Sequence, residues 1–200
     1  MTGALQMLLS GGPSAPAVGE YMINNGYLPW MVPAGVTSVC VVCVGNGGAG
    51  IQFGGIVYGG GGGGLAYKNN ITVTPGDSIL LGVDLYADRV NFGSVVAAYN
   101  GQTGSASPTS GGTGTGGDVN NTGGAGSGGF GGSWPGGSAA NYTGNGANGG
   151  GQGIGLTGTG SSGDYGRGGA SIYSGTGETG GAGAVRVIWG AGRSFPSNAA

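Results

Sequence analysis

Short apolar runs alternate with glycine-rich stretches along the chain. The runs at residues 30–44, 65–74, 78–83 and 184–189 are rich in Val, Ile and aromatic residues. Such residues favour strands, and runs of about four to eight residues between turn signals are typical of strands. The Pro-Gly pair at residues 75–76 supplies the dihedral angles of a tight reversal between two of the runs. The pattern therefore predicts a mainly β protein with little or no α-helix.

The apolar run at residues 184–189 needs strand partners, and the other segments rich in Val and Ile lie before residue 100. The last strand must therefore return to the first ones. We expect a β-sandwich-like framework of residues 27–100 and 184–190, with residues 101–183 as an insert. The complete domain then covers residues 27–200, and a leader of residues 1–26 precedes it.

The insert is too rich in glycine to hold a conventional core. Gly makes up 57 of the 200 residues of the chain, against about 7% in ordinary proteins. Ordering the backbone costs about 1 kcal/mol or more per residue, and the few large apolar side chains of the insert cannot offset that cost. Either the insert is irregular, or contacts between backbone groups hold it together.

The spacing of the glycines favours backbone contacts. Gly recurs at every third position in several short phases, for example at residues 111–117, 123–132, 160–169 and 177–183. A helix of the polyproline II type has three residues per turn, so such spacing leaves one face without Cβ atoms. Neighbouring helices can then join through N–H···O=C and Cα–H···O contacts. We expect a layered bundle of short polyglycine II helices.

Charge and composition argue against several functions. The formal net charge is −2, with five Lys or Arg residues and no His. So few cations cannot neutralise a run of phosphates, so we expect no nucleic-acid partner. Without His the chain lacks the usual general base and the commonest metal ligand. We therefore expect a protein that is not an enzyme, with no catalytic residues, no metal and no cofactor.

Two motifs are similar to known sites but have the wrong context. Cys40 and Cys43 have the spacing of redox and zinc sites, yet they lie in a Val-rich strand where positions i and i+3 face opposite sides. We expect buried free thiols. Residues 59–64 are all Gly but lack the Gly-Lys-Ser/Thr ending of a phosphate loop, and strand residues follow them.

The leader is apolar at its start. It has no basic region, and Gln6 interrupts its apolar run, so it does not fit a signal peptide. No segment of the chain approaches the roughly 18 to 20 apolar residues of a membrane helix, so we expect no membrane insertion. A frayed terminus is one interpretation of the leader. The other is attachment to a larger assembly through four apolar side chains: Leu5, Met7, Leu8 and Leu9.

Three blocks of the sequence together resemble a known family. Residues 30–39, 59–76 and 183–197 are similar to the glycine-rich domain at the C-terminal ends of tailed-bacteriophage tail fibre and tip adhesin proteins. The resemblance implies a virion protein, made in the host cytoplasm and located in the tail or an exposed appendage. It also implies partners among other virion proteins of the fibre, baseplate or tail. Fibres of this type are commonly trimeric, so we expect a homotrimer, with a monomer seated on another protein as the alternative.

A host-surface polysaccharide or an outer-membrane protein is the receptor that this resemblance implies. Aromatic side chains at turns between glycine helices could stack on sugars or dock on a protein loop. Because Pro135 and nearby Asn residues mark a turn, we expect Trp134 and Tyr142 to be exposed. The alternative is that the aromatic rings cover the ends of the bundle. The candidate receptor-binding residues are Phe130, Trp134, Tyr142, Tyr165 and Tyr173.

Two other functions compete with host recognition. A purely architectural baseplate, tail or capsid decoration protein would have the same composition and no receptor. A disordered, silk-like or cell-wall protein would also be glycine-rich, but the strand-forming runs at residues 30–44 and 184–189 would serve no purpose in such a chain.

Overall fold

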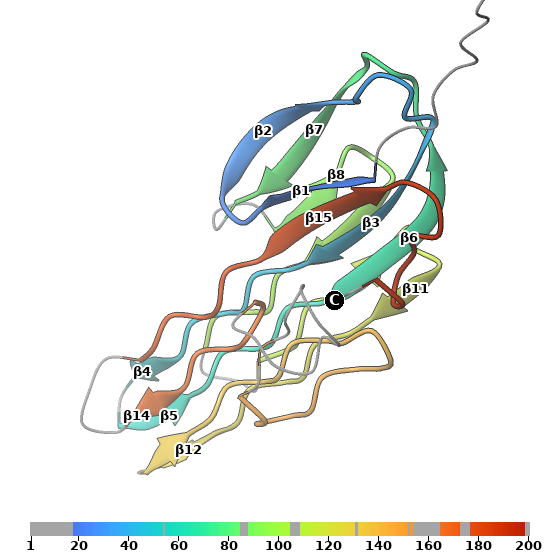
Figure 1. Cartoon of the computed structure of the whole chain (residues 1–200). Helices are drawn as coiled ribbons and strands as arrows, with labels where there is room; N and C mark the ends of the chain where they lie inside the picture. Colours follow the sequence, from blue (N-terminus) through green and yellow to red (C-terminus); the bar gives the residue numbers. More distant parts are fainter. Residues whose placement is uncertain are drawn as a thin grey trace, which may run out of the picture.

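The computed structural model describes residues 18–53, 55–84, 88–104, 109–130, 132–151, 153, 165–172 and 177–198. None of these residues is helical, and their regular elements are all β-strands (Figure 1). The prediction of a mainly β fold is confirmed.

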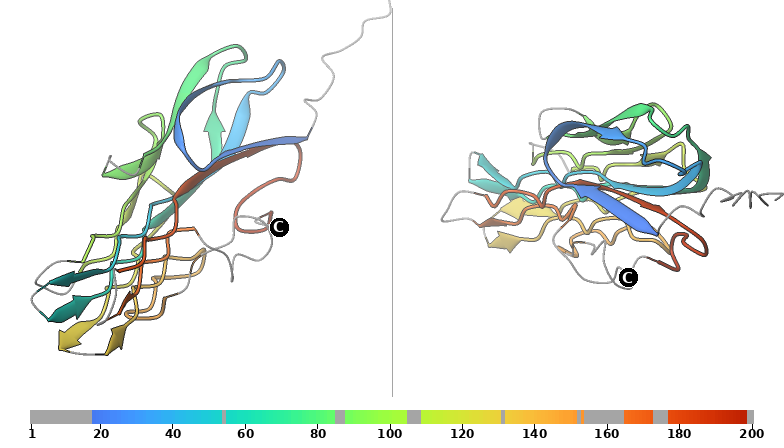
Figure 2. Two further views of the ribbon diagram at one scale, coloured as in Figure 1. Left: turned by 90° about the vertical axis from the view of Figure 1, so that its left-hand side faces the viewer. Right: turned by 45° about the horizontal axis from the view of Figure 1, so that its top comes forward.

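Two five-stranded antiparallel sheets form one end of the molecule (Figures 1 and 2). Sheet A has the order β1 (Gly19–Ile23), β15 (Ala184–Trp189), β3 (Ser38–Val44), β6 (Leu65–Thr72) and β11 (Val119–Asn121). Sheet B has the order β10 (Gly114–Thr115), β9 (Val96–Tyr99), β8 (Arg89–Phe92), β7 (Ser78–Val83) and β2 (Gly26–Met31). The last strand, β15, thus returns to lie between β1 and β3.

The main core fills the space between these sheets. Val41 and Cys43 of sheet A pack there with Leu81 and Phe92 of sheet B, and all four are buried. Alternate residues of β3, Cys40 and Val42 among them, belong to a second cluster on the other face of sheet A. Since both faces of β3 are covered, its sequence is a continuous apolar run rather than an alternating one.

Strand β1 lies within residues 1–26, which the sequence assigns to the leader. It pairs with β15 from Gly19 opposite Trp189 to Ile23 opposite Val185. The only local signal is the short run of residues 21–23, and such a run is too short to be recognised as a strand without its partner. The leader residues Leu5, Met7, Leu8 and Leu9 lie outside the described residues.

A layer of extended glycine-rich segments continues from the sandwich, and residues 59–64 lie at its centre. Their six N–H groups donate, at 2.7 to 3.1 Å, to segments at residues 99–102, 124–127 and 166–169. The partner segment repeats at every third residue: Gly59 and Gly62 share one neighbour, Gly60 and Gly63 the next, Gly61 and Gly64 the last. A β-strand would alternate between two neighbours, so this rotation has the threefold symmetry expected of a polyglycine II helix.

The six carbonyl groups of residues 59–64 are paired as well. They accept hydrogen bonds from residues 45–48, 109–112 and 137–140, five from backbone N–H groups and one from the Thr109 hydroxyl. All twelve backbone polar groups of this segment are therefore satisfied by six neighbouring segments, without any side chain of its own. A buried backbone without such partners would be strongly destabilised.

The layer begins before residue 101. Residues 45–50 and 59–64 belong to it, although the sequence places them in the β-framework. Parts of the expected insert, including most of the glycine phase at residues 160–169, lie outside the described residues. A polyglycine II bundle across all of residues 101–183 therefore stays a prediction.

Alanine at Gly62 should destabilise the fold strongly. A Cβ at Gly62 would collide with the carbonyl group of Ser138, whereas a Cβ at Gly144 would meet nothing within 4 Å. We expect Gly62→Ala to lower the free energy of unfolding by about 3 kcal/mol or more, because the backbone of a neighbouring segment must move. The matched control Gly144→Ala should stay within about 0.5 kcal/mol of the wild type in chemical denaturation. Equal stabilities of the two variants would contradict the close packing.

An ion pair joins β1, an edge strand of sheet A, to its neighbour β15. The Arg186 guanidinium is buried and donates to the Glu20 carboxylate at 2.7 Å, and Arg193 donates to it at 3.3 Å. The hydrogen bond from Arg186 is the main cause of a pKa of Glu20 below its ordinary value of 4.5. The ionised carboxylate therefore stabilises the folded state above pH 4.5, and this contribution is lost as the pH falls through the lowered pKa.

Glu20→Gln should lower stability at pH 7 and reduce its loss on acidification. The comparison is the free energy of unfolding at pH 7 and at about pH 3 in denaturant titrations. Glu178→Gln is the control, because Glu178 and Arg167 form a longer pair of 3.7 Å with both side chains partly exposed. A wild-type acid dependence that Glu20→Gln leaves unaltered would contradict the assignment.

Candidate display surface at the end of the glycine layer

Short strands gather at the end of the glycine layer that lies away from the sandwich (Figures 1 and 2). Three of them form an antiparallel sheet with the order β12 (Gly128–Phe130), β5 (Ile56–Tyr58) and β4 (Ile51–Phe53). Two more, β13 (Ser133–Trp134) and β14 (Ser171–Ile172), pair beside it. Each is held by the glycine segments that lead into it, so the layer fixes the position of this end.

The register places four apolar side chains on one face of the three-stranded sheet. Phe130 lies opposite Ile56, and Tyr58 lies opposite Ile51. Residues opposite each other or two apart on a strand share a face. We call Ile51, Ile56, Tyr58 and Phe130 the tip face.

Phe130 dominates this face. Its side chain is 82% exposed, the largest value among the exposed large hydrophobic residues of the described chain. Ile51, Ile56 and Tyr58 are half-buried, and the tip face contains no charged residue. The ring of Tyr58 lies against Gly128, where a Cβ would collide with it. The tip face can therefore contact a ligand through apolar and aromatic surface and the Tyr58 hydroxyl.

Trp134 lies on the other side of the same sheet. A Cβ on Gly129 would come within 2.7 Å of the Trp134 ring, so the indole packs on the glycine backbone of β12. Val57 faces the same side and is fully buried. Trp134 is therefore half-buried and packs on the face of β12 that is opposite the tip face. This position differs from the exposed one that the turn residues suggest.

The expectation that Tyr142 is exposed is wrong. Its side chain is only 6% exposed and packs beneath sheet A, stacked on Phe195 with a centroid distance of 5.9 Å and tilted against Tyr67 at 5.9 Å. The predicted turn is present, since Asn141 bridges to Gly144. The ring nevertheless turns inward, because Tyr67 and Phe195 form an apolar surface that local sequence does not reveal.

The remaining candidates from the sequence are not on the tip face. Tyr165 is half-buried and packs against the same cluster as Tyr142. Tyr173 lies outside the described residues. Of the five aromatic residues singled out, only Phe130 is both described and strongly exposed. The sequence missed Ile51, Ile56 and Tyr58, although two short apolar runs around a glycine pair at residues 54–55 are a hairpin signal.

The two cysteines are buried free thiols, as their strand context predicts. Cys43 points into the main core, where burial raises the pKa of its thiol. Cys40 points to the opposite side and donates to the Arg193 carbonyl at 3.3 Å. Among the described residues there is no group of three or more His, Cys, Asp or Glu residues arranged to hold a metal ion. This part of the chain also has no helix that could span a membrane.

Comparison with known proteins adds no relative. The chain matches no protein-family model, and a search of curated proteins finds no match.

Tyr142 allows the buried ring and its hydroxyl to be tested separately. Burial raises the pKa of its phenol, and the hydroxyl has no hydrogen-bond partner within the described structure. Tyr142→Phe should keep the wild-type stability or gain up to about 1 kcal/mol, because an unsatisfied polar group is removed. Tyr142→Ala should lose about 3–5 kcal/mol through the cavity it leaves. Denaturant titration measures both, and a loss above about 1 kcal/mol in Tyr142→Phe would contradict the unsatisfied hydroxyl.

Proposed function

We propose that this protein is a bacteriophage virion protein, a tail fibre or tip adhesin component, that presents its tip face to the host cell surface. The observation that carries the proposal is the position of Phe130, 82% exposed at the end of the glycine layer away from the sandwich. Ile51, Ile56 and Tyr58 lie beside it on the same face, and contiguous apolar surface of this kind marks interaction sites. The sequence resemblance to tip adhesins supports the same function.

Binding at the tip face would be non-catalytic. An uncharged surface with Phe130 and Tyr58 suits ring stacking on a polysaccharide or docking against an apolar loop of an outer-membrane protein. Release of water from the apolar surface provides the driving force. The glycine layer contributes rigidity, because residues 59–64 leave no backbone polar group unpaired. Little conformational freedom would be lost when the tip binds.

An architectural role is the second candidate, and a different surface favours it. The outer side of sheet B exposes Tyr27, Pro29 and Met31 of β2 beside Leu80 of β7. Exposed apolar surface of this kind is typical of protein interfaces. In the proposed adhesin this sandwich end would contact the other virion proteins or the other copies of a homotrimer, while the tip face stays free.

Phe130→Ala should weaken binding of the purified protein to intact host cells by about tenfold or more, as removal of a central interface aromatic does. Val95→Ala is the control, because Val95 is an exposed apolar residue in the turn between β8 and β9, outside both the tip face and the apolar surface of β2 and β7. Cell-binding isotherms and competition with phage adsorption measure the effect. Wild-type protein that neither binds cells nor slows adsorption would favour the architectural role, and equal losses in both variants would contradict recognition at the tip face.

A further inference from the structure

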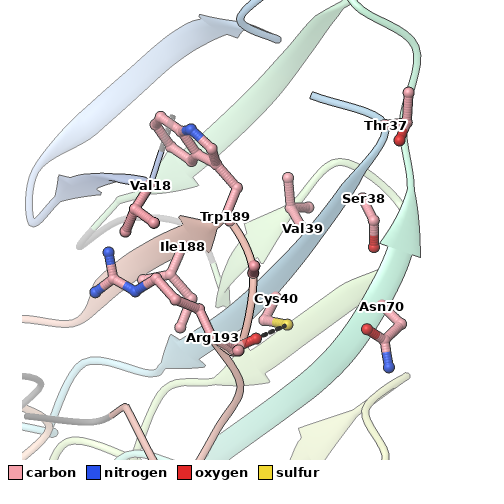
Figure 3. Close-up of a pocket in the computed structure, with 12 residues that line it drawn as sticks. Val18, Thr37, Ser38, Val39, Cys40, Asn70, Ile188, Trp189 and Arg193 are labelled. Carbon is pink, nitrogen blue, oxygen red and sulfur yellow. Dashed lines mark hydrogen bonds between the residues drawn. The ribbon is translucent and has the colours of Figure 1, made fainter. Parts of the chain in front are cut away.

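A polar groove of about 220 Å³ lies on the outer face of sheet B, between β8, β9, β10 and the turn at residues 93–95. Its walls carry exposed polar side chains, and no function described above uses it. A larger hollow of about 550 Å³ lies between the end of β15 and the start of β3 (Figure 3). That hollow offers little surface to a ligand, because Val39, Cys40 and Ile188 in its walls are at most 4% exposed. The groove on sheet B is therefore the stronger candidate for a binding site.

The pattern of the strands produces the groove. Arg89 and Asn91 of β8 point outward, because the alternate residues of this strand are buried in the main core. The register places Asn91 opposite Ala97, and Ala97 opposite Thr115. Ala97 has a short side chain, so the surface is low between its two larger neighbours. Gly116 also lines the groove and adds no side chain that would fill it, and its φ of 75° favours glycine.

Hydrogen bonds hold three polar side chains of the groove in place. The Arg89 guanidinium donates to the Tyr99 hydroxyl at 3.2 Å and lies 5.8 Å from the centre of that ring. The Asn91 amide donates to the Gly93 carbonyl at 2.8 Å, and the Thr115 hydroxyl donates to a carbonyl of β9 at 3.4 Å. The oxygen atoms of the Asn91 amide and the Thr115 hydroxyl can still accept hydrogen bonds. Side chains held in this way lose little conformational freedom when a ligand binds.

The charge of the groove favours an anionic group on the ligand. Arg89 is the only charged residue among those that line it. A guanidinium has five N–H donors, so several remain for a ligand after the bond to Tyr99. The nearest carboxylate oxygen recorded for Arg89 is that of Asp88, 3.8 Å from its Nε, and both side chains are exposed. Such a long, exposed ion pair is weak, so Asp88 compensates the charge of Arg89 only in part.

We propose that the groove binds one acidic sugar residue of a glycan, whose carboxylate accepts hydrogen bonds from Arg89 and whose ring hydroxyls donate to Asn91 and Thr115. Guanidinium and carboxylate groups match in geometry and form strong, charge-assisted hydrogen bonds. The volume of about 220 Å³ is below the roughly 300 to 1,000 Å³ typical of sites for drug-sized ligands, so it suits a single sugar unit. An inorganic anion would use Arg89 alone. This inference does not depend on the tip face, which lies at the other end of the molecule.

Titration of the ¹⁵N-labelled protein with sodium D-galacturonate, followed by NMR, tests the groove directly. The backbone amide signals of residues 89–97 and 114–116 should shift and saturate. D-galactose has the same ring without the carboxylate, and sodium acetate has the carboxylate without the ring. Each should bind about tenfold more weakly, since each lacks one set of the proposed hydrogen bonds. Absence of saturable shifts with galacturonate, or equal affinity for either comparison compound, would overturn the proposal.

Arg89→Gln should bind galacturonate about tenfold more weakly than the wild type and no more tightly than galactose, because the charge-assisted hydrogen bonds are lost. Val95→Ala is the matched control: Val95 also lines the groove, but its truncation leaves every polar group there in place. It should bind like the wild type. Phe130→Ala should also bind like the wild type, so a failure of the tip face can be told apart from a failure of the groove. Wild-type affinity in Arg89→Gln would overturn the assignment of the carboxylate to Arg89.

Discussion

Hydrogen bonds between backbone groups of extended, glycine-rich segments are the interaction on which the far half of this molecule depends. Residues 59–64 show the constraint in its full form, because six neighbouring segments satisfy all of their N–H and C=O groups. Six neighbours can approach so closely only where no Cβ intervenes. At Gly60, Gly61 and Gly62 an added Cβ would collide with the backbone of a different neighbour in each case. Close packing of the segments therefore requires the high glycine content. Ordering a glycine backbone costs conformational entropy, and hydrogen bonds to every backbone N–H and C=O group of residues 59–64 oppose that cost.

The sandwich supplies the register that the glycine layer cannot set for itself. β3 and β9 run directly into glycine segments at residues 45–50 and 99–104, and segments at residues 59–64 and 177–183 run directly into β6 and β15. Strands with large side chains have one favourable register, because a slip by one residue would move buried side chains to the wrong face. Glycine segments have no such preference. The side chains of the sandwich therefore fix the register of its strands. The hydrogen-bonded glycine segments that continue from these strands carry the same register to the tip.

The sequence predicts those strands that neighbouring residues define. It does not predict features that depend on contacts between residues far apart in the chain. Runs such as residues 38–44 and 184–189 are recognisable as strands because β-branched residues are bounded by turn signals. Residues 59–64 stand out as six consecutive glycines, but the run alone does not show that it lies at the centre of the layer, because that position depends on six segments spread over the chain. The turn around Tyr142 predicts a position at the surface, but the ring is buried because it packs on Phe195, far along the chain. Phe130 was identified, whereas its companions Ile51, Ile56 and Tyr58 become a surface only through strand pairing.

Because the glycine layer has no side-chain core, a substitution at the tip has little effect on the rest of the fold. In an ordinary domain a change in a surface loop is transmitted inward through packed side chains, and neighbouring changes couple. The segments that hold the tip strands contact one another through backbone atoms, which are the same for every sequence that keeps the required glycines. Phe130 and Tyr58 rest on the backbone of β12 and β5, so their replacement leaves the hydrogen bonds of residues 59–64 intact. A surface of this kind can change its side chains, and hence its binding partner, at little cost to the fold. That separation is the physical reason why a protein selected for changing contacts would use glycine-rich layers in place of a second hydrophobic core.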